Sequence, residues 1–172
     1  MKRPRKNYDY SRAGVAMVTL KTRPGVWLCR ITQESFTPTP TGRAVQRELM
    51  GIPGYYDQVK VGQYQIMPDH LHALVHVVRD LPAGVTLQRV IRGFKLGVNR
   101  ACRQATGAAS MRVFERGMYD SLVFDRAHLQ REVAYIRDNV RRYRLRRAHP
   151  ELFRRARRLS EVPGGVPLWG FG

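Results

Sequence analysis

The chain has 172 residues, enough for one domain with a buried core, and 43% of them are apolar, which excludes a wholly disordered protein. Lys and Arg number 31 against 13 Asp and Glu, so the net charge is +18 and most of it must lie on the surface. A positive field of this strength attracts nucleic-acid phosphates first and anionic membranes second.

Membrane association is not supported by the sequence. No apolar run approaches the roughly 20 residues that span a bilayer, and the basic start, residues 1–6, is followed by polar residues instead of a signal-peptide core. Cys29 and Cys102 are far apart and in no metal or redox spacing, so we expect buried thiols. The composition therefore predicts a cytoplasmic, nucleoid-associated nucleic-acid binder.

The first half of the chain is predicted to begin with two strands, residues 13–21 and 26–32, joined as a hairpin by the turn residues 23–25. Pro38 and Pro40 then break the chain. Thr41 is the predicted N-cap of a helix that carries Val45 and Leu49 on one face and is closed by residues 51–54. Residues 58–67 follow as a strand.

The next strand, residues 70–78, has the clearest alternation in the sequence. One of its faces is wholly apolar and is expected to be core; it consists of Leu71, Ala73, Val75 and Val77. The other face carries His70, His72, Leu74 and His76. Two imidazoles are therefore expected to lie side by side on one face of a strand.

Two amphipathic helices dominate the second half. Thr86 caps the first, which ends at Gly107 and has a basic outer face; its predicted buried positions are Leu87, Val90, Ile91, Phe94, Val98 and Ala101. A strand is expected within residues 118–124. Asp125 caps the last helix, whose predicted apolar stripe is Leu129, Val133, Ile136, Val140 and Tyr143.

The order β-β-α-β-β-α-β-α predicts an α+β, ferredoxin-like fold in which helices pack on an antiparallel sheet. We expect a single domain over residues 1–148 and a basic tail over residues 149–172.

Two pairs of residues suggest chemistry. Neutral imidazole is a ready ligand for divalent metals, so His70 and His72 are candidate ligands, although a His-x-His pair also occurs by chance on polar faces. Tyr135 and Asn139 are four residues apart and share a helix face, although a tyrosine beside an apolar stripe is usually there for packing.

The motifs taken together resemble a known family. The run Gln-Ile-Met-Pro-Asp-His-Leu-His at residues 65–72 is similar to the His-hydrophobic-His motif of the HUH single-strand endonucleases, specifically the single-tyrosine transposases and the REP-associated tyrosine transposases. The run Tyr-Ile-Arg-Asp-Asn at residues 135–139 resembles their Tyr-Ile-x-x-Asn-Pro motif. Residues 8–11 and 94–95 also match family positions, so the resemblance spans most of residues 8–148.

This resemblance implies that Tyr135 is the nucleophile and that His70, His72 and Asn139 bind Mg²⁺ or Mn²⁺. Attack by the tyrosine would leave a 5′-phosphotyrosine and a free 3′-OH, with the metal stabilising charge at phosphorus. The family's proline after the asparagine is Val140 here, so the last helix is expected to continue.

Basic residues for DNA contact are plentiful. The predicted set comprises Arg92, Lys95, Arg141, Arg142, Arg154, Arg155, Arg157 and Arg158. The expected partner is single-stranded or hairpin DNA, and the protein is expected to be a monomer or a homodimer.

Three alternatives remain in view. A non-catalytic DNA or RNA hairpin-binding protein derived from such a transposase would have the same charge and fold. A ribosomal-type structural protein gives no reason for His70, His72, Tyr135 and Asn139 to occur together. A hydrolytic metallonuclease would need more carboxylates near the histidines, where Asp69 is the only close one.

Overall fold

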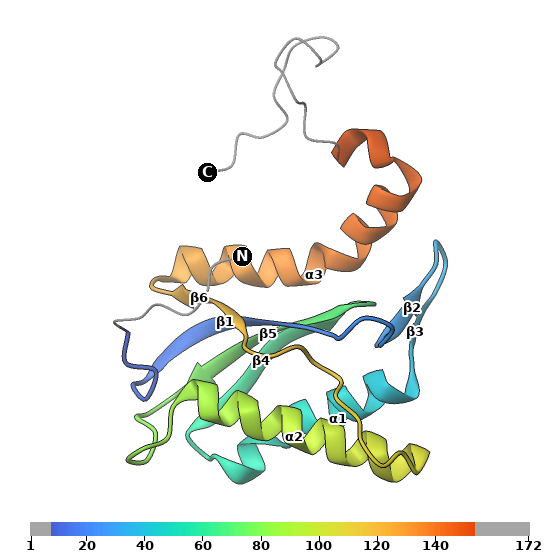
Figure 1. Cartoon of the computed structure of the whole chain (residues 1–172). Coiled ribbons are helices and arrows are strands. Elements are labelled where there is room, and N and C mark those ends of the chain that lie inside the picture. The colour runs from blue at the N-terminus through green and yellow to red at the C-terminus, as the bar shows by residue number, and fades with distance from the viewer. Residues whose placement is uncertain (1–7, 154–172) are drawn as a thin grey trace.

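The computed structural model describes residues 8–153 and shows a four-stranded antiparallel sheet between two layers of helices (Figure 1). The sheet contains β1 (Gly14–Lys21), β4 (Val59–Ile66), β5 (His70–Val77) and β6 (Tyr119–Val123), in the order β4-β5-β1-β6. With α1 (Pro40–Tyr55) after β1 and α2 (Leu87–Thr106) after β5, the chain follows a βαββαβ path. The predicted α+β class with helices on an antiparallel sheet is confirmed.

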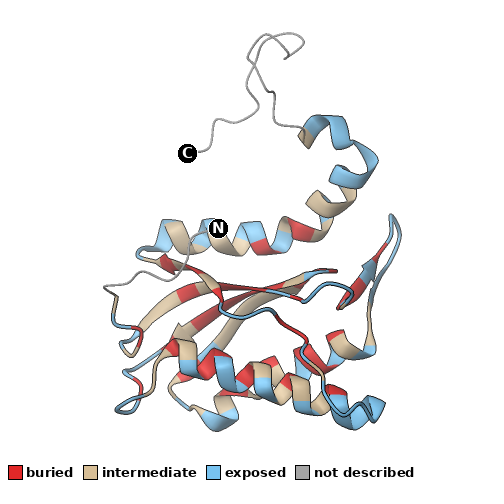
Figure 2. Cartoon of the chain, in the orientation of Figure 1, coloured by how far each residue is buried: buried red, intermediate tan, exposed pale blue. Residues whose placement is uncertain are grey.

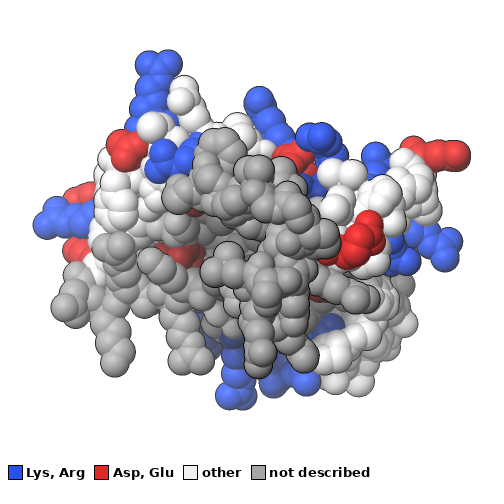
Figure 3. Space-filling view, turned by 90° about the horizontal axis from the view of Figure 1, so that it is seen from above, with Lys and Arg blue, Asp and Glu red and all other residues white. Residues whose placement is uncertain are grey.

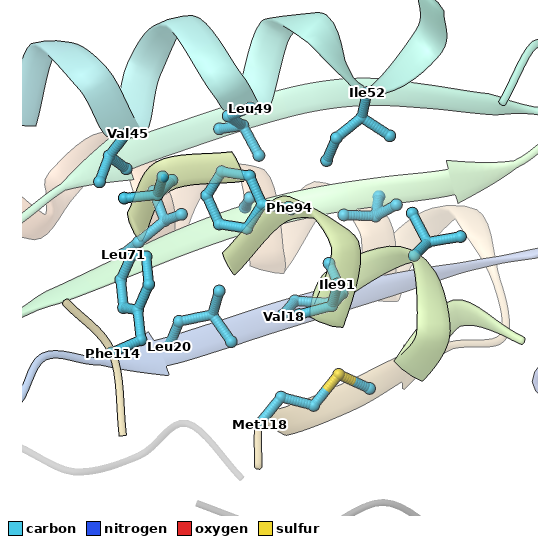
Figure 4. Packing of buried hydrophobic residues seen from close by; sticks show 14 of the residues in the cluster. Val18, Leu20, Val45, Leu49, Ile52, Leu71, Ile91, Phe94, Phe114 and Met118 are labelled. Atoms are coloured by element: carbon cyan, nitrogen blue, oxygen red, sulfur yellow. The ribbon is translucent and has the colours of Figure 1, made fainter. Parts of the chain in front are cut away.

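The main core lies between the sheet and the layer formed by α1 and α2. Leu71, Val18 and Leu20 point from the sheet toward Val45 and Phe94 on the helices (Figure 4). The predicted apolar face of β5, from Leu71 to Val77, is buried throughout. Figure 2 shows the same concentration of buried residues on this side of the sheet.

Helix α2 has the predicted ends and the predicted buried face. The Thr86 side chain accepts a hydrogen bond from the backbone of Arg89, and Gly107 closes the helix at φ 69°, a left-handed conformation that glycine adopts without strain. Among its predicted core positions only Ala101 is half-buried instead of buried, and Cys102 is buried one residue further on.

The predicted hairpin between residues 13–21 and 26–32 is wrong. The turn at residues 23–26 exists, with Gly25 at φ 81° and the backbone N–H of Val26 donating to Arg23. However, β1 pairs with β5 on one edge and β6 on the other, so it has no free edge for another strand. The second segment forms β2 (Cys29–Ile31) and pairs instead with β3 (Phe36–Pro38), a strand that was not predicted.

Both predicted ends of α1 are also wrong. The N-cap is Thr39, whose hydroxyl oxygen accepts from the backbone of Gly42, because Pro40 suits the first helical position. The helix continues through residues 51–54 to Tyr55, since Ile52 extends the buried stripe. Gly42 is needed for close packing: a Cβ there would lie 1.9 Å from the Leu28 carbonyl oxygen.

Helix α3 (Arg126–Ala148) covers the opposite face of the sheet and is followed by a short 3₁₀ helix, η1 (Pro150–Phe153) (Figure 1). Asp125 caps α3 as predicted. Its predicted apolar stripe is only partly buried: Ile136 is fully enclosed, whereas the other four members are half-buried. This layer is therefore thinner than the one formed by α1 and α2.

Two further expectations can be checked. No helix among the described residues is long and apolar enough to cross a membrane. Cys29 and Cys102 are free and buried, as predicted, and burial raises the pKa of the Cys29 thiol to about 12. Neither thiol is a reactive group at neutral pH.

Candidate active site

The two histidines of the motif lie on β5, between β4 and β1, on the face covered by α3. Because alternate residues of a strand point to the same side, His70 and His72 project together, and their ring centroids are 4.6 Å apart. The central position of β5 means that both neighbouring strands fix its backbone. The structure therefore holds the two imidazoles on a rigid platform.

His72 is enclosed: only 2% of it is exposed. Its Nδ1 lies 2.7 Å from the hydroxyl oxygen of Thr19, the residue directly opposite on β1. Burial, followed by repulsion from His70, lowers the pKa of His72 to about 4, so the ring is neutral at physiological pH. When Nδ1–H donates to Thr19, the lone pair on Nε2 is free for another partner.

His70 is less buried and has an acidic partner. Its Nδ1 lies 2.7 Å from the exposed carboxylate of Asp69. A carboxylate at this position accepts the Nδ1–H and leaves Nε2 as the free acceptor. Both imidazoles are thus oriented through Nδ1, by a hydroxyl in one case and a carboxylate in the other.

Tyr135 on α3 meets this pair of rings. Its ring centroid is 5.3 Å from that of His72 in an edge-to-face arrangement, and the guanidinium of Arg142 lies 5.6 Å from the same ring. The tyrosine is 37% exposed, so a partner from solvent has access to it. Residues 63 positions apart in the sequence are therefore in contact at one site, as the motif interpretation requires.

Asn139 lies one turn after Tyr135 on the same face of α3 and is 7% exposed. Its amide nitrogen is buried without a hydrogen-bond partner among the described residues. A buried amide without a hydrogen-bond partner usually lowers folding stability, so the Asn139 amide is a candidate for binding a group from outside the chain. Nitrogen and oxygen of an amide exchange on rotation by a half turn, and the oxygen is a ligand for hard divalent cations.

Within residues 8–153, no three His, Cys, Asp or Glu side chains are grouped closely enough to hold a metal ion. A site built on two imidazoles would therefore need a third ligand of another type, and the buried amide of Asn139 fits that need. Two imidazole nitrogens and an amide oxygen suit Mn²⁺ and, less closely, Mg²⁺.

The predicted DNA-binding residues divide between the two helical layers. Arg141 and Arg142 lie on α3; Arg142 is beside the Tyr135 ring, whereas Arg141 pairs with Asp138 at 3.5 Å. Arg92 and Lys95 lie on α2, across the sheet, and the structure does not bring them to the histidines. Arg154, Arg155, Arg157 and Arg158 are outside the described residues.

Lys95 already has a local role. Its ammonium group donates to the backbone carbonyls of Glu115, at 2.9 Å, and of Gly117. Burial lowers its pKa. The side chain thus fixes the loop that precedes β6.

The C-terminal half of α3 is connected to the β2–β3 hairpin. Arg144 donates from Nε to the carbonyl oxygen of Thr32 at 2.7 Å and from a terminal nitrogen to that of Ser35 at 3.2 Å. Figure 3, which looks down on the α3 layer, shows Lys and Arg side chains at several places around the visible described surface. Two hydrogen bonds from Arg144 therefore connect the end of α3 to the β2–β3 hairpin.

Thr19 and Arg144 are the site's supporting residues that sequence reasoning missed. Alternation along residues 13–21 could have placed Thr19 on the α3 side of β1, but the pairing of β1 with β5 is needed to set it opposite His72. Nothing in the sequence links Arg144 to the residues 112 and 109 positions away whose carbonyl groups it contacts.

No family model matches the chain. An uncharacterized protein from Haemophilus influenzae is 23% identical over 153 residues, which cover 78% of this chain and 84% of that protein. Among solved structures, a REP-associated tyrosine transposase bound to a REP hairpin is similar with a TM-score of 0.56 and 16% identity, over 83% of this chain and 74% of that one. At this identity the likeness shows a transposase-like fold.

Proposed function

We propose that the protein is a single-stranded DNA endonuclease and strand transferase that acts at DNA hairpin sites through Tyr135. The observation that carries the proposal is the contact between Tyr135 and His72, whose ring centroids are 5.3 Å apart. The ring of His70 lies beside that of His72 on the same face of the sheet. The similar solved structure is a tyrosine transposase bound to a hairpin, which supports the choice of DNA partner. The positive charge of +18 supports it as well.

The proposed reaction is a transesterification. The Tyr135 oxygen attacks phosphorus and forms a P–O bond while the bond from phosphorus to the 3′ oxygen breaks. The phenol gives up its proton, and the departing oxygen takes one up to become a free 3′-OH. The 5′ end remains attached to the protein as a phosphotyrosine, so the bond energy is retained for rejoining to another strand.

His70, His72 and Asn139 would hold Mg²⁺ or Mn²⁺, which when bound supplies positive charge to the phosphate. The remaining residues prepare the site for this role. Thr19 and Asp69 orient the imidazoles, and burial keeps His72 neutral and able to bind a cation. Arg142, whose guanidinium lies beside the Tyr135 ring, would hold a DNA phosphate near the nucleophile.

The test is covalent capture of DNA. Protein is incubated with hairpin oligonucleotides that carry single-stranded flanks taken from DNA beside the gene, with Mn²⁺ or Mg²⁺, and adducts are separated on a denaturing gel. The unmodified protein should form an adduct. Tyr135→Phe keeps the ring and should bind the hairpin normally but form none. An adduct of normal yield from Tyr135→Phe would exclude it as the nucleophile.

Tyr143→Phe is the matched control on the same helix. Its hydroxyl oxygen accepts a hydrogen bond from Arg147 at 3.2 Å, and its ring packs at the edge of the core, so this variant should still cut. His70→Ala with His72→Ala, or a chelator, should abolish capture and leave hairpin binding largely intact. Full binding without capture by the unmodified protein would instead support the alternative, a hairpin-binding protein that does not cut.

A further inference from the structure

One lysine lies on the same sheet face as the two histidines. Lys21 is the last residue of β1 and stands directly opposite His70 in the β1–β5 ladder. Directly opposed residues of an antiparallel pair have Cβ atoms about 5 Å apart and point to the same side. The neighbouring pair shows this side directly, because Thr19 contacts His72. The side chain of Lys21 therefore leaves the sheet on the same face as the imidazole of His70.

A second contact locates the ammonium group. Lys21 Nζ lies 5.7 Å from the centroid of the Tyr119 ring, and Tyr119 is the β6 residue paired with Thr19. The ammonium group therefore lies on the β6 side of β1, while the histidines are on β5, on the other side of β1. An aromatic face next to an ammonium group limits where the flexible side chain can go. The side chain is exposed, so DNA bound over the histidines can reach it.

The charge of Lys21 has no acidic partner among the described residues. The carboxylate closest in sequence to His70 is that of Asp69, which is bonded to His70 Nδ1. The two other lysines in residues 8–153 differ in placement. Lys95 is bonded to backbone carbonyls across the sheet, and Lys60 stands opposite His76, at the far end of the histidine face.

From these contacts we propose that Lys21 is a catalytic residue of the same reaction, one that contacts a nonbridging oxygen of the scissile phosphate. The inference rests on the proposed function. A phosphodiester carries one negative charge, and attack by a tyrosine oxygen concentrates more charge on the oxygens around phosphorus. A fixed cation at that place stabilises the transition state more than the ground state. Lys21 is paired with His70 in the sheet and has its ammonium group beside Tyr119, whereas Arg142 has its guanidinium beside Tyr135, so β1 and α3 each supply one cation to this face of the sheet.

The experiment compares Lys21→Ala, Lys21→Arg and Lys60→Ala with the unmodified protein. The probe is the hairpin oligonucleotide that forms the adduct, or the tightest-binding hairpin if none does. The rate of adduct formation should fall about 100-fold in Lys21→Ala, the usual cost of losing one donor to a developing oxyanion. Lys21→Arg keeps the charge and should recover most of the rate, and Lys60→Ala should react at the normal rate.

A binding measurement on the same hairpin separates this inference from the proposed function. Loss of one single-strand phosphate contact should reduce the slope of log K against log salt by about 0.7 in Lys21→Ala. An unchanged slope, or an adduct rate within about twofold of normal, would overturn the role of Lys21. If the unmodified protein forms no adduct, the proposed function fails. A reduced slope would then retain Lys21 as a phosphate contact and reject it as a catalytic residue.

Discussion

The hydroxyl group of Thr19 is expected to be essential for positioning His72, and Thr19→Val tests this with little change in shape. Valine replaces the hydroxyl by a methyl group and is well suited to a strand. The variant leaves the imidazole Nδ1 without the partner that lies 2.7 Å away in the structure. Both residues are almost completely buried, at 3% and 2% exposure, so water cannot take the place of the hydroxyl.

The expected magnitude follows from that burial. An unpaired buried polar group costs about 1–3 kcal/mol of folding stability. For a chain of this size each kcal/mol lowers the melting temperature by about 2–4 °C. Loss of the group that orients a metal-binding imidazole typically weakens metal affinity or activity about 10- to 100-fold. Thr19→Val should therefore affect both stability and Mn²⁺ binding.

The assay is thermal unfolding together with Mn²⁺ titration by calorimetry, followed by adduct formation. Thr19→Ser retains the hydroxyl and should recover much of the Mn²⁺ affinity. The matched control is Thr106→Val, since Thr106 is exposed at the end of α2, across the sheet from the site, and its hydroxyl bonds only to nearby backbone groups, so it should contribute little. If Thr19→Val melts and binds Mn²⁺ like the unmodified protein, the hydroxyl has no positioning role.

Three other perturbations test the layer that contains the site. Arg144→Ala removes both hydrogen bonds to the β2–β3 hairpin and should speed amide exchange in residues 29–38; unchanged exchange there would mean that the brace is unimportant. Ile136→Ala removes the only fully enclosed aliphatic side chain of α3, and should cost about 2–5 kcal/mol and expose α3 to exchange first; equal loss of protection in α2 would contradict this. The third concerns pH. Burial lowers the pKa of His72 from 6.5 to about 4, so between these values the unfolded metal-free chain holds a proton that the folded chain lacks. Stability should therefore decrease by about 3 kcal/mol as pH falls from 6.5 to 4, and His72→Gln should remove that part of the dependence in denaturant titrations.

Local patterns predicted most of the fold. The alternation of residues 70–78, the caps at Thr86 and Asp125, and the end at Gly107 all correspond to observed features because each depends on neighbours in sequence. The predicted hairpin of residues 13–32 is wrong because strand pairing is decided by competition for edges. Two strands distant in the sequence, β5 and β6, pair with the two edges of β1, and this pairing cannot be predicted from the sequence of residues 13–32 alone.

The candidate site, like the fold, could be predicted only where it depends on residues close together in the sequence. The two motifs singled out His70, His72, Tyr135 and Asn139 as candidates, but only the tertiary structure shows that Tyr135 contacts His72, 63 residues earlier in the chain. The residues that surround Tyr135 and His72 could not be predicted from the sequence. Thr19, Lys21 and Arg144 act through partners more than 45 residues away in sequence, and their residue types are ordinary at those positions.

The two layers of the protein have different roles in such a site. The sheet fixes His70 and His72 between neighbouring strands, whereas α3 presents Tyr135, Asn139 and Arg142 from one helix. Because these three residues share one helix, any shift of α3 moves the phenol, the amide and the guanidinium together relative to the histidines. Only Ile136 and Asn139 of this helix are buried, so packing alone holds it weakly.

Val140 stands where the motif that this segment resembles has a proline, and this difference bears on the length of α3. A proline would interrupt the hydrogen bonding of α3 one residue after Asn139, whereas valine lets the helix run to Ala148. That extension carries Arg144 to the β2–β3 hairpin, where it is bonded to two carbonyl oxygens. The chain therefore compensates for a thin buried interface with a polar brace beyond the site. We therefore expect loss of the Arg144 hydrogen bonds to loosen α3 and, with it, the contact between Tyr135 and His72.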